Sequence, residues 1–181
     1  MSFHKILLMQ SVEDVITLRR RQKIESNPAV QGCEFAHCYA VELKSEQKLM
    51  RVGQMMESVM AQPFDQDGLT QRLIRQIGEF NPDLLLVHPG FVFRMYTNEV
   101  LSALKIVKAQ FPNLKFGLLN SEDPLAYINN ATKEFFDSDA ELQELIEQVS
   151  IPRRPLPKII RVPPDFAQWR SIIWYEGPSL N

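Results

Sequence analysis

Polar side chains that could do hydrolytic chemistry follow the three most apolar runs of the chain. They are Gln10, Ser11, His88, Asn120, Ser121 and Asp123. If those runs are parallel strands, their carboxyl ends share one edge of a sheet, where open α/β proteins bind ligands. A serine nucleophile, the His88 base and the Asp123 carboxylate would then form a hydrolytic triad, with Ser11 or Ser121 as nucleophile. The Gly-x-Ser-x-Gly turn of α/β hydrolases is absent from the sequence, and both serines are equally explained as helix-cap or loop residues.

His88 is the strongest single candidate for a functional side chain. An imidazole at the end of a central strand, followed by Pro89-Gly90, could be a ligand, a base or a pH-sensitive contact. It could also simply be satisfied by a backbone carbonyl. The shape of this edge separates two hypotheses. A deep polar pocket at His88 would favour a small-molecule binder or enzyme, and a filled edge would favour a non-catalytic module.

An aromatic segment with one arginine follows His88. Its members are Phe91, Phe93, Arg94 and Tyr96, with Met95 between them. Tyrosine, arginine and methionine are enriched at protein interfaces. We expect a loop that contributes binding residues at the same edge as His88 and Asn120, although such a loop could also fold back as a lid or as core.

Metal, phosphate and disulfide chemistry have little support in the sequence. Cys33, His37 and Cys38 could supply metal ligands, but in an extended strand Cys38 points away from the other two. The same geometry separates the two cysteines too far for a disulfide. The seven glycines form no phosphate-binding loop. We therefore expect no metal and no cofactor.

Composition places the chain among ordinary globular proteins. It has 181 residues, of which 45% are hydrophobic and 23% charged. The net charge of −2 lacks the basic excess of proteins that coat nucleic acids. No run approaches the roughly 20 apolar residues that span a membrane, and the apolar run near the N-terminus is too short for a signal peptide. With two cysteines that do not pair, the sequence predicts a cytoplasmic protein with neither nucleic-acid nor membrane partners.

The elements that would position these residues alternate between strand and helix. The expected strands are 6–9, 33–43, 84–87, 114–119 and 134–136. The expected helices are 11–24, 44–61, 69–80, 98–110 and 139–149, with Ser11 capping the first and Leu49 on the inner face of the second. This alternation predicts an α/β fold with a parallel sheet. We expect a flavodoxin-like three-layer sandwich around five strands.

Residues 80–149 carry a recognisable order of elements. A strand begins at Pro82-Asp83, a helix ends before Pro112, and a strand, a short helix, a short strand and a last helix follow. This order resembles the second half of a response-regulator receiver domain.

The resemblance implies the shape of a receiver without its chemistry. Receivers accept phosphate on an aspartate at the end of the third strand, where this chain has His88. They bind magnesium through an acidic pair at the end of the first strand, where Gln10 and Ser11 stand. The resemblance thus implies a pseudo-receiver, a non-catalytic regulatory or signalling module that acts through protein–protein contacts.

The last 31 residues have a different character. Half of the twelve prolines fall within 152–178, and five basic against two acidic residues give 151–181 a charge of +3, leaving −5 for 1–150. The segment is also apolar, and its predicted interface residues are Phe166, Trp169, Trp174 and Tyr175. We expect one α/β domain over 1–150 and a proline-rich C-terminal arm over 151–181. The arm packs either on its own domain or, preferably, on a second copy in a homodimer.

Overall fold

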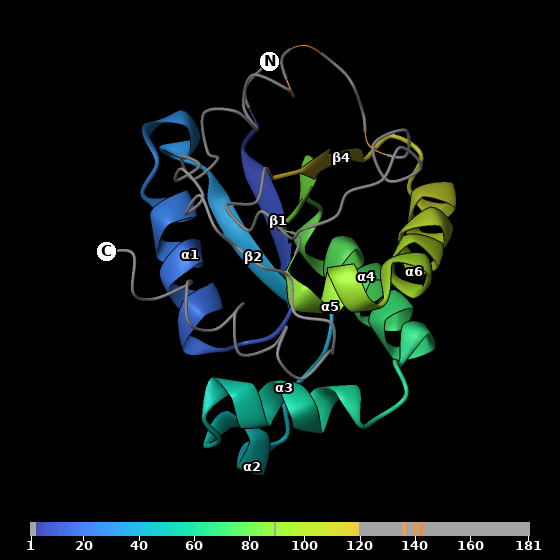
Figure 1. Cartoon of the computed structure of the whole chain (residues 1–181). Helices are drawn as coiled ribbons and strands as arrows, with labels where there is room; N and C mark the ends of the chain where they lie inside the picture. The colour runs from blue at the N-terminus through green and yellow to red at the C-terminus, as the bar shows by residue number, and fades with distance from the viewer. Residues whose placement is uncertain (1–2, 89, 120–135, 137–139, 141, 143–181) are drawn as a thin grey trace, which may run out of the picture.

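The computed structural model describes residues 3–88, 90–119, 136, 140 and 142, in which strands alternate with helices (Figure 1). The elements are β1 (Lys5–Gln10), α1 (Val15–Glu25), η1 (Pro28–Val30), β2 (Glu34–Tyr39), α2 (Ser45–Lys48), α3 (Val52–Met60), α4 (Gln66–Phe80), β3 (Leu84–Val87), α5 (Phe91–Met95), α6 (Thr97–Gln110) and β4 (Lys115–Leu118). The C-terminal arm lies outside the described residues. Of the expected last helix only Ala140 and Leu142 are described, and both are helical; of the expected fifth strand only Phe136 is described, and it lies in a bend.

The four described strands form one parallel sheet in the order β2-β1-β3-β4, which confirms the predicted α/β class. In the central register, Met9 pairs with Cys38 on one side and with Val87 on the other. The chain moves one way from β1 to β2 and the opposite way from β2 to β3 and β4. The carboxyl ends of β1 and β3 therefore flank the switch point of the topology, where open α/β sheets usually bind ligands.

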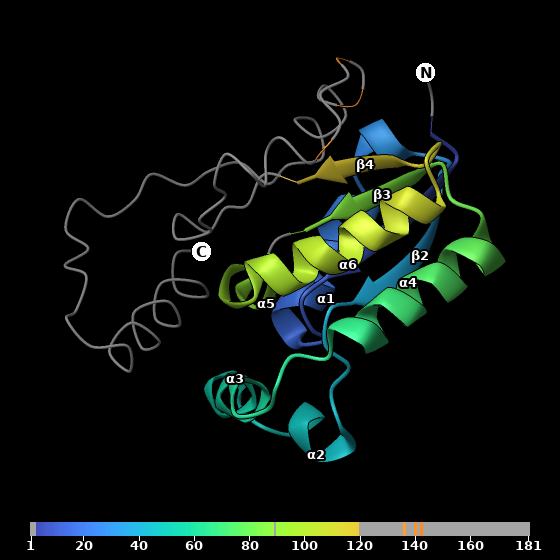
Figure 2. The same ribbon diagram turned by 90° about the vertical axis from the view of Figure 1, so that its right-hand side faces the viewer.

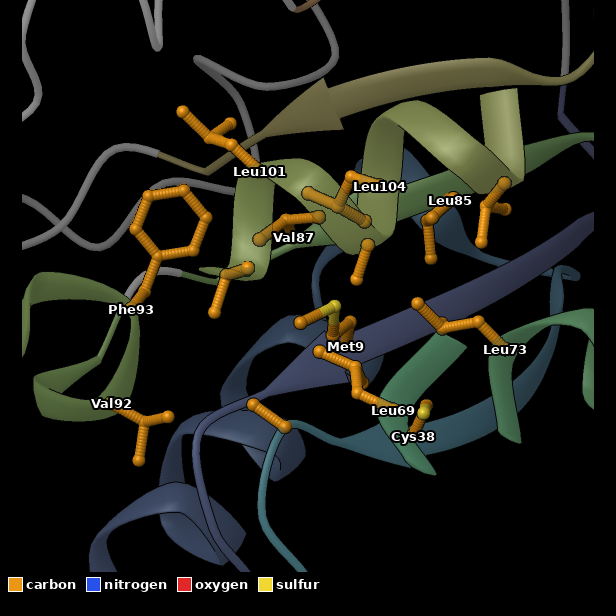
Figure 3. Close-up of a cluster of buried hydrophobic side chains, with 14 of the residues drawn as sticks. Met9, Cys38, Leu69, Leu73, Leu85, Val87, Val92, Phe93, Leu101 and Leu104 are labelled. Carbon is orange, nitrogen blue, oxygen red and sulfur yellow. The ribbon is translucent and has the colours of Figure 1, made fainter. Parts of the chain in front are cut away.

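Helices cover both faces of the sheet. Leu7, Met9, Leu85 and Val87 pack with α4 and α6 on one face (Figures 2 and 3). Ile6, Leu8, Leu84 and Leu86 pack with Ile24 of α1 on the other face. The connection from β1 to β2 runs in one direction across the sheet, and the later connections run in the other direction. Connections of the same handedness then place α1 on one face and α4 and α6 on the other. This double cover explains why both central strands are uninterrupted apolar runs.

The first helix begins three residues later than predicted. Asp14, and not Ser11, is the N-cap: its Oδ1 accepts a hydrogen bond from Thr17 N at 2.7 Å. Asp14 N in turn donates to Thr17 Oγ1 at 3.0 Å, which completes a capping box. Ser11 is left in the buried connection between β1 and α1.

The predicted helix 44–61 is two helices, α2 and α3, with a break at Leu49–Arg51. Gln47 turns inward in α2, where its Nε2 donates to Ser58 Oγ at 3.0 Å and its Oε1 accepts from Lys44 N at 2.8 Å. Leu49 is then directed outward and is 89% exposed, so its predicted place on an inner face is wrong. The break is accompanied by buried polar contacts of Gln47, which cannot be predicted from the spacing of hydrophobic residues.

Candidate functional site

The carboxyl ends of β1 and β3 bring together three of the predicted site residues. Gln10 and His88 occupy neighbouring positions just beyond the last paired residues, Met9 and Val87. His88 N donates to Met9 O at 2.8 Å, which extends the ladder by one bond. Gln10, Ser11 and His88 are only 1%, 3% and 3% exposed. The other members of the predicted edge, Asn120, Ser121 and Asp123, lie outside the described residues.

This edge is closely packed. An added Cβ on Gly90 would lie 1.9 Å from Ser11 Oγ, so the serine side chain fills the space beside the glycine backbone. Gln10 Nε2 donates to Thr17 O of α1 at 3.0 Å. Neither of the two cavities beside β2, described below, is lined by His88. Among the described residues, the side chains at the ends of β1 and β3 are therefore buried and closely packed.

Three polar atoms at this edge have no hydrogen-bond partner among the described residues. They are Gln10 Oε1, Ser11 Oγ and His88 Nδ1. Ser11 Oγ and His88 Nδ1 are thus not bonded to each other, and this serine lacks the nucleophile–base contact that a triad requires.

His88 is electrically neutral in this environment. Burial and, to a smaller extent, the positive charge of Arg20 on α1 together lower the pKa of its imidazole to about 3. A neutral imidazole cannot compensate the charge of an anion. His88 therefore contributes packing and hydrogen-bonding capacity at this edge rather than charge.

The aromatic segment after His88 is a short helix, α5, and not a loop. Val92 and Phe93 are 0% and 3% exposed and belong to the same hydrophobic cluster as Leu101 of α6 (Figure 3). Phe93 therefore contributes to packing and is withdrawn from the surface. Tyr96 is half-buried and stacks on Phe64, with ring centroids 5.1 Å apart. Phe91 is also half-buried, and Arg94 lies within α5.

Four exposed apolar side chains lie on the segments that follow the strands. Val15, Leu49, Met50 and Met95 are 57%, 89%, 38% and 40% exposed, and we call them the carboxyl-edge surface. Val15 begins α1, Leu49 and Met50 follow α2, and Met95 ends α5; these helix ends lie beyond the carboxyl ends of β1, β2 and β3 (Figures 1 and 2). The sequence pattern missed Leu49 because it extended one helical period across the break after α2.

Contacts tie the parts of this surface together. Lys48 Nζ of α2 lies 3.2 Å from Glu13 Oε2, in the connection that leads into Val15. The Phe64–Tyr96 stack joins the segment before α4 to the end of α5. Lys48 and Glu13 are substantially exposed, so their pair orients α2 more than it stabilises the fold.

Two cavities open beside β2. One of about 290 Å³ lies at its carboxyl end and includes Phe64, Arg72 and Tyr96. Arg72 closes its inner wall by donating from Nη2 to Tyr39 O at 3.1 Å and to Ala40 O at 3.0 Å. The other, of about 640 Å³, lies between the end of α1 and the first half of β2.

The cysteines are thiols on opposite faces of the sheet. Cys33 contacts the α1-side core, and Cys38 is buried in the α4-side core. Burial raises the pKa of Cys38 to about 11 and also raises the pKa of Cys33, so neither is an activated nucleophile. Within the described residues, no three histidine, cysteine, aspartate or glutamate side chains are grouped so that they could hold a metal ion.

Comparison of the chain with protein-family models, with curated proteins and with solved structures found no match. Among the described helices, none combines the length and the apolar character needed to cross a membrane.

Proposed function

We propose that the chain is a non-catalytic regulatory module that acts through protein–protein contacts made by its carboxyl-edge surface. The observation that carries this proposal is the combination of a filled switch point with apolar side chains exposed around it. The edge that usually holds a ligand in this kind of sheet is occupied by Gln10, Ser11 and His88. In this proposal the edge acts through its exposed outer surface, which contacts a protein partner.

The electrostatics of the edge support a module without phosphoryl chemistry. Receivers need carboxylates where this chain has Gln10, Ser11 and a neutral His88. Amide, hydroxyl and neutral imidazole groups offer a magnesium ion none of the charged oxygen ligands that usually hold it. The protein is in this proposal a pseudo-receiver, with shape retained and phosphate acceptance lost.

The described strand order supports the finer architecture that we propose. The order β2-β1-β3-β4 is the first part of the flavodoxin-like order, and residues 134–136 would complete it as a fifth strand beside β4. We further propose a cytoplasmic homodimer in which the C-terminal arm contacts the second copy, with no nucleic-acid partner. The +3 charge of the arm against −5 for the rest of the chain supports contact between arm and body.

A matched pair of charge substitutions tests the docking surface. Leu49→Glu alters the most exposed apolar residue of the carboxyl-edge surface, and Ile106→Glu alters a 47% exposed residue on α6. Proteins captured from a lysate of the source cell by the full chain should be lost with Leu49→Glu and kept with Ile106→Glu. A purified partner should bind Leu49→Glu about 30-fold more weakly, the effect of an interface hot spot. Equal binding by both variants would refute the assigned surface.

The non-catalytic part of the proposal has its own test. Acetyl phosphate or beryllofluoride, added with magnesium, should leave the amide spectrum of the full chain unchanged. A stoichiometric, magnesium-dependent change would show that the edge still accepts a phosphoryl group and would refute the proposal.

The unpartnered polar atoms favour a second candidate, a small-molecule binder or hydrolase-like enzyme at His88. Gln10 Oε1 and His88 Nδ1 are buried without partners among the described residues, and such atoms gain most from a ligand that satisfies them. For this candidate, His88→Ala should abolish ligand binding. A His88→Ala protein that retains all of it would exclude the edge as the site.

A further inference from the structure

The cavity of about 640 Å³ between α1 and β2 has the size of a small-molecule site. Its walls are the end of α1, two residues of η1 (Pro28 and Val30), the turn at Gly32 and one face of β2. Three β2-side residues, Cys33, Phe35 and His37, alternate along one face and project toward the cavity. It is remote from the carboxyl-edge surface, and its function is independent of the docking proposed above.

The cavity carries a single negative charge. Of the described residues that line it, Glu25 alone is an ionised side chain at neutral pH. His37 is neutral there, because burial and then the positive charge of Arg21 lower its pKa, against a smaller opposing effect of Glu25. Arg21 is outside the lining; its Nε lies 4.0 Å from Glu25 Oε1, and its Nη1 donates to Tyr39 Oη at 3.2 Å. The lining itself therefore offers a ligand one carboxylate acceptor and no cationic side chain.

Its floor combines a hydrogen-bond acceptor with aromatic faces. His37 Nε2 lies 2.8 Å from Glu25 Oε1, so the neutral imidazole donates a hydrogen bond to the carboxylate, and Arg21 Nε approaches the same oxygen at 4.0 Å. The rings of Phe35 and His37 are parallel within 6°, with centroids 6.4 Å apart. A carboxylate beside parallel aromatic rings matches a flat cation, which gains from both the charge and the ring faces.

We propose that this cavity binds a small planar organic cation of the amidinium or protonated amino-heterocycle class. The N–H groups of the ligand donate to the Glu25 carboxylate, and its ring packs against Phe35 and His37. Glu25 is the last residue of α1, and β2 is an edge strand of the described sheet.

Benzamidinium and benzoate test this assignment, because they have nearly the same shape and opposite charges. Each is titrated into the full chain at pH 7.5 by calorimetry and by amide NMR. Benzamidinium should change the amide chemical shifts of residues 25–37 only, and it should bind at least tenfold more tightly than benzoate. Glu25→Gln should weaken benzamidinium at least tenfold, the effect of removing one charge-assisted hydrogen bond. Phe35→Leu should also weaken it.

Glu34→Gln is the matched control. Glu34 is a second carboxylate nearby, at the start of β2, but its side chain is 70% exposed and lies 3.9 Å from Lys5 Nζ. This variant should bind benzamidinium within twofold of the unmodified chain. The proposal is overturned if benzamidinium fails to bind, if benzoate binds equally well, or if Glu34→Gln loses as much affinity as Glu25→Gln. Should Glu25→Gln fail to fold, the benzoate comparison and Phe35→Leu decide the outcome.

Discussion

Acidification should destabilise this protein through His88 before most carboxylates titrate. Its pKa is about 3 in the folded chain and 6.5 for an ordinary histidine. As the pH falls through 6.5, the unfolded chain takes up a proton on this imidazole, and the folded chain does not until about pH 3. The contribution of His88 is thus fully present above pH 6.5 and is lost progressively as the pH falls toward 3.

The size of the effect follows from the two pKa values. Each unit of difference corresponds to about 1.4 kcal/mol, so His88 costs the folded state about 2 kcal/mol between pH 7 and pH 5. Between pH 7 and pH 4 the loss from this one group reaches about 3 kcal/mol by the same reasoning. Both are large fractions of the 5–15 kcal/mol that stabilises a typical domain.

Urea denaturation followed by circular dichroism at pH 7, 6 and 5 measures this effect. The unmodified chain should lose about 2 kcal/mol more unfolding free energy from pH 7 to pH 5 than His88→Gln, which cannot titrate. His37→Gln is the control for the other histidine with a lowered pKa. In this variant the unfolding free energy should still fall between pH 7 and pH 5 by the amount that His88 contributes. Parallel pH profiles for His88→Gln and the unmodified chain, or an NMR titration of His88 near pH 6.5, would refute the reasoning.

Four further outcomes are expected. Gly90→Ala forces a Cβ to within 1.9 Å of Ser11 Oγ and should cost about 1–3 kcal/mol of unfolding free energy in urea, most of it restored by adding Ser11→Gly. Asp83→Asn should flatten the fall in stability as the pH drops below 4, because two backbone amides at the start of β1 bond this carboxylate and lower its pKa; identical acid profiles would contradict this. Arg72→Met should speed proteolysis near the end of β2, whose last carbonyls lose their donor, and unchanged cleavage sites would count against that role. Deleting 151–181 should yield a monomer or an aggregating protein, and an unchanged size by light scattering together with unchanged stability would show the arm to be passive.

The central strands could be predicted from the sequence because burial on both faces leaves a signature. Residues 6–9 and 84–87 are continuous apolar runs, and every one of their side chains is at most 2% exposed. A short run of this kind has few stable places other than the interior of a parallel sheet. The grouping of Gln10, Ser11 and His88 followed from the same inference, since parallel strands share their carboxyl edge.

The rest of the site depends on contacts that no periodic pattern encodes. The exposure of Leu49 depends on hydrogen bonds that hold Gln47 inside. The filled edge depends on a glycine backbone lying against Ser11. The Glu25–His37 pair joins residues on a helix and a strand, and nothing in their local sequence announces the 2.8 Å contact between them.

The place of β1 in the sheet has a consequence for the chain as it leaves the ribosome. β1 is the first strand to be synthesised, yet it lies between β2 and β3. Its first edge can pair once Glu34 has emerged, but the partner of the second edge, starting at Leu84, comes 50 residues later. At roughly 5–20 residues per second, translation leaves that edge open for about 3–10 s. A nascent chain stalled before Leu84 would therefore present an apolar template for strand pairing with its neighbours on a polysome, and translation beyond β3 would withdraw it.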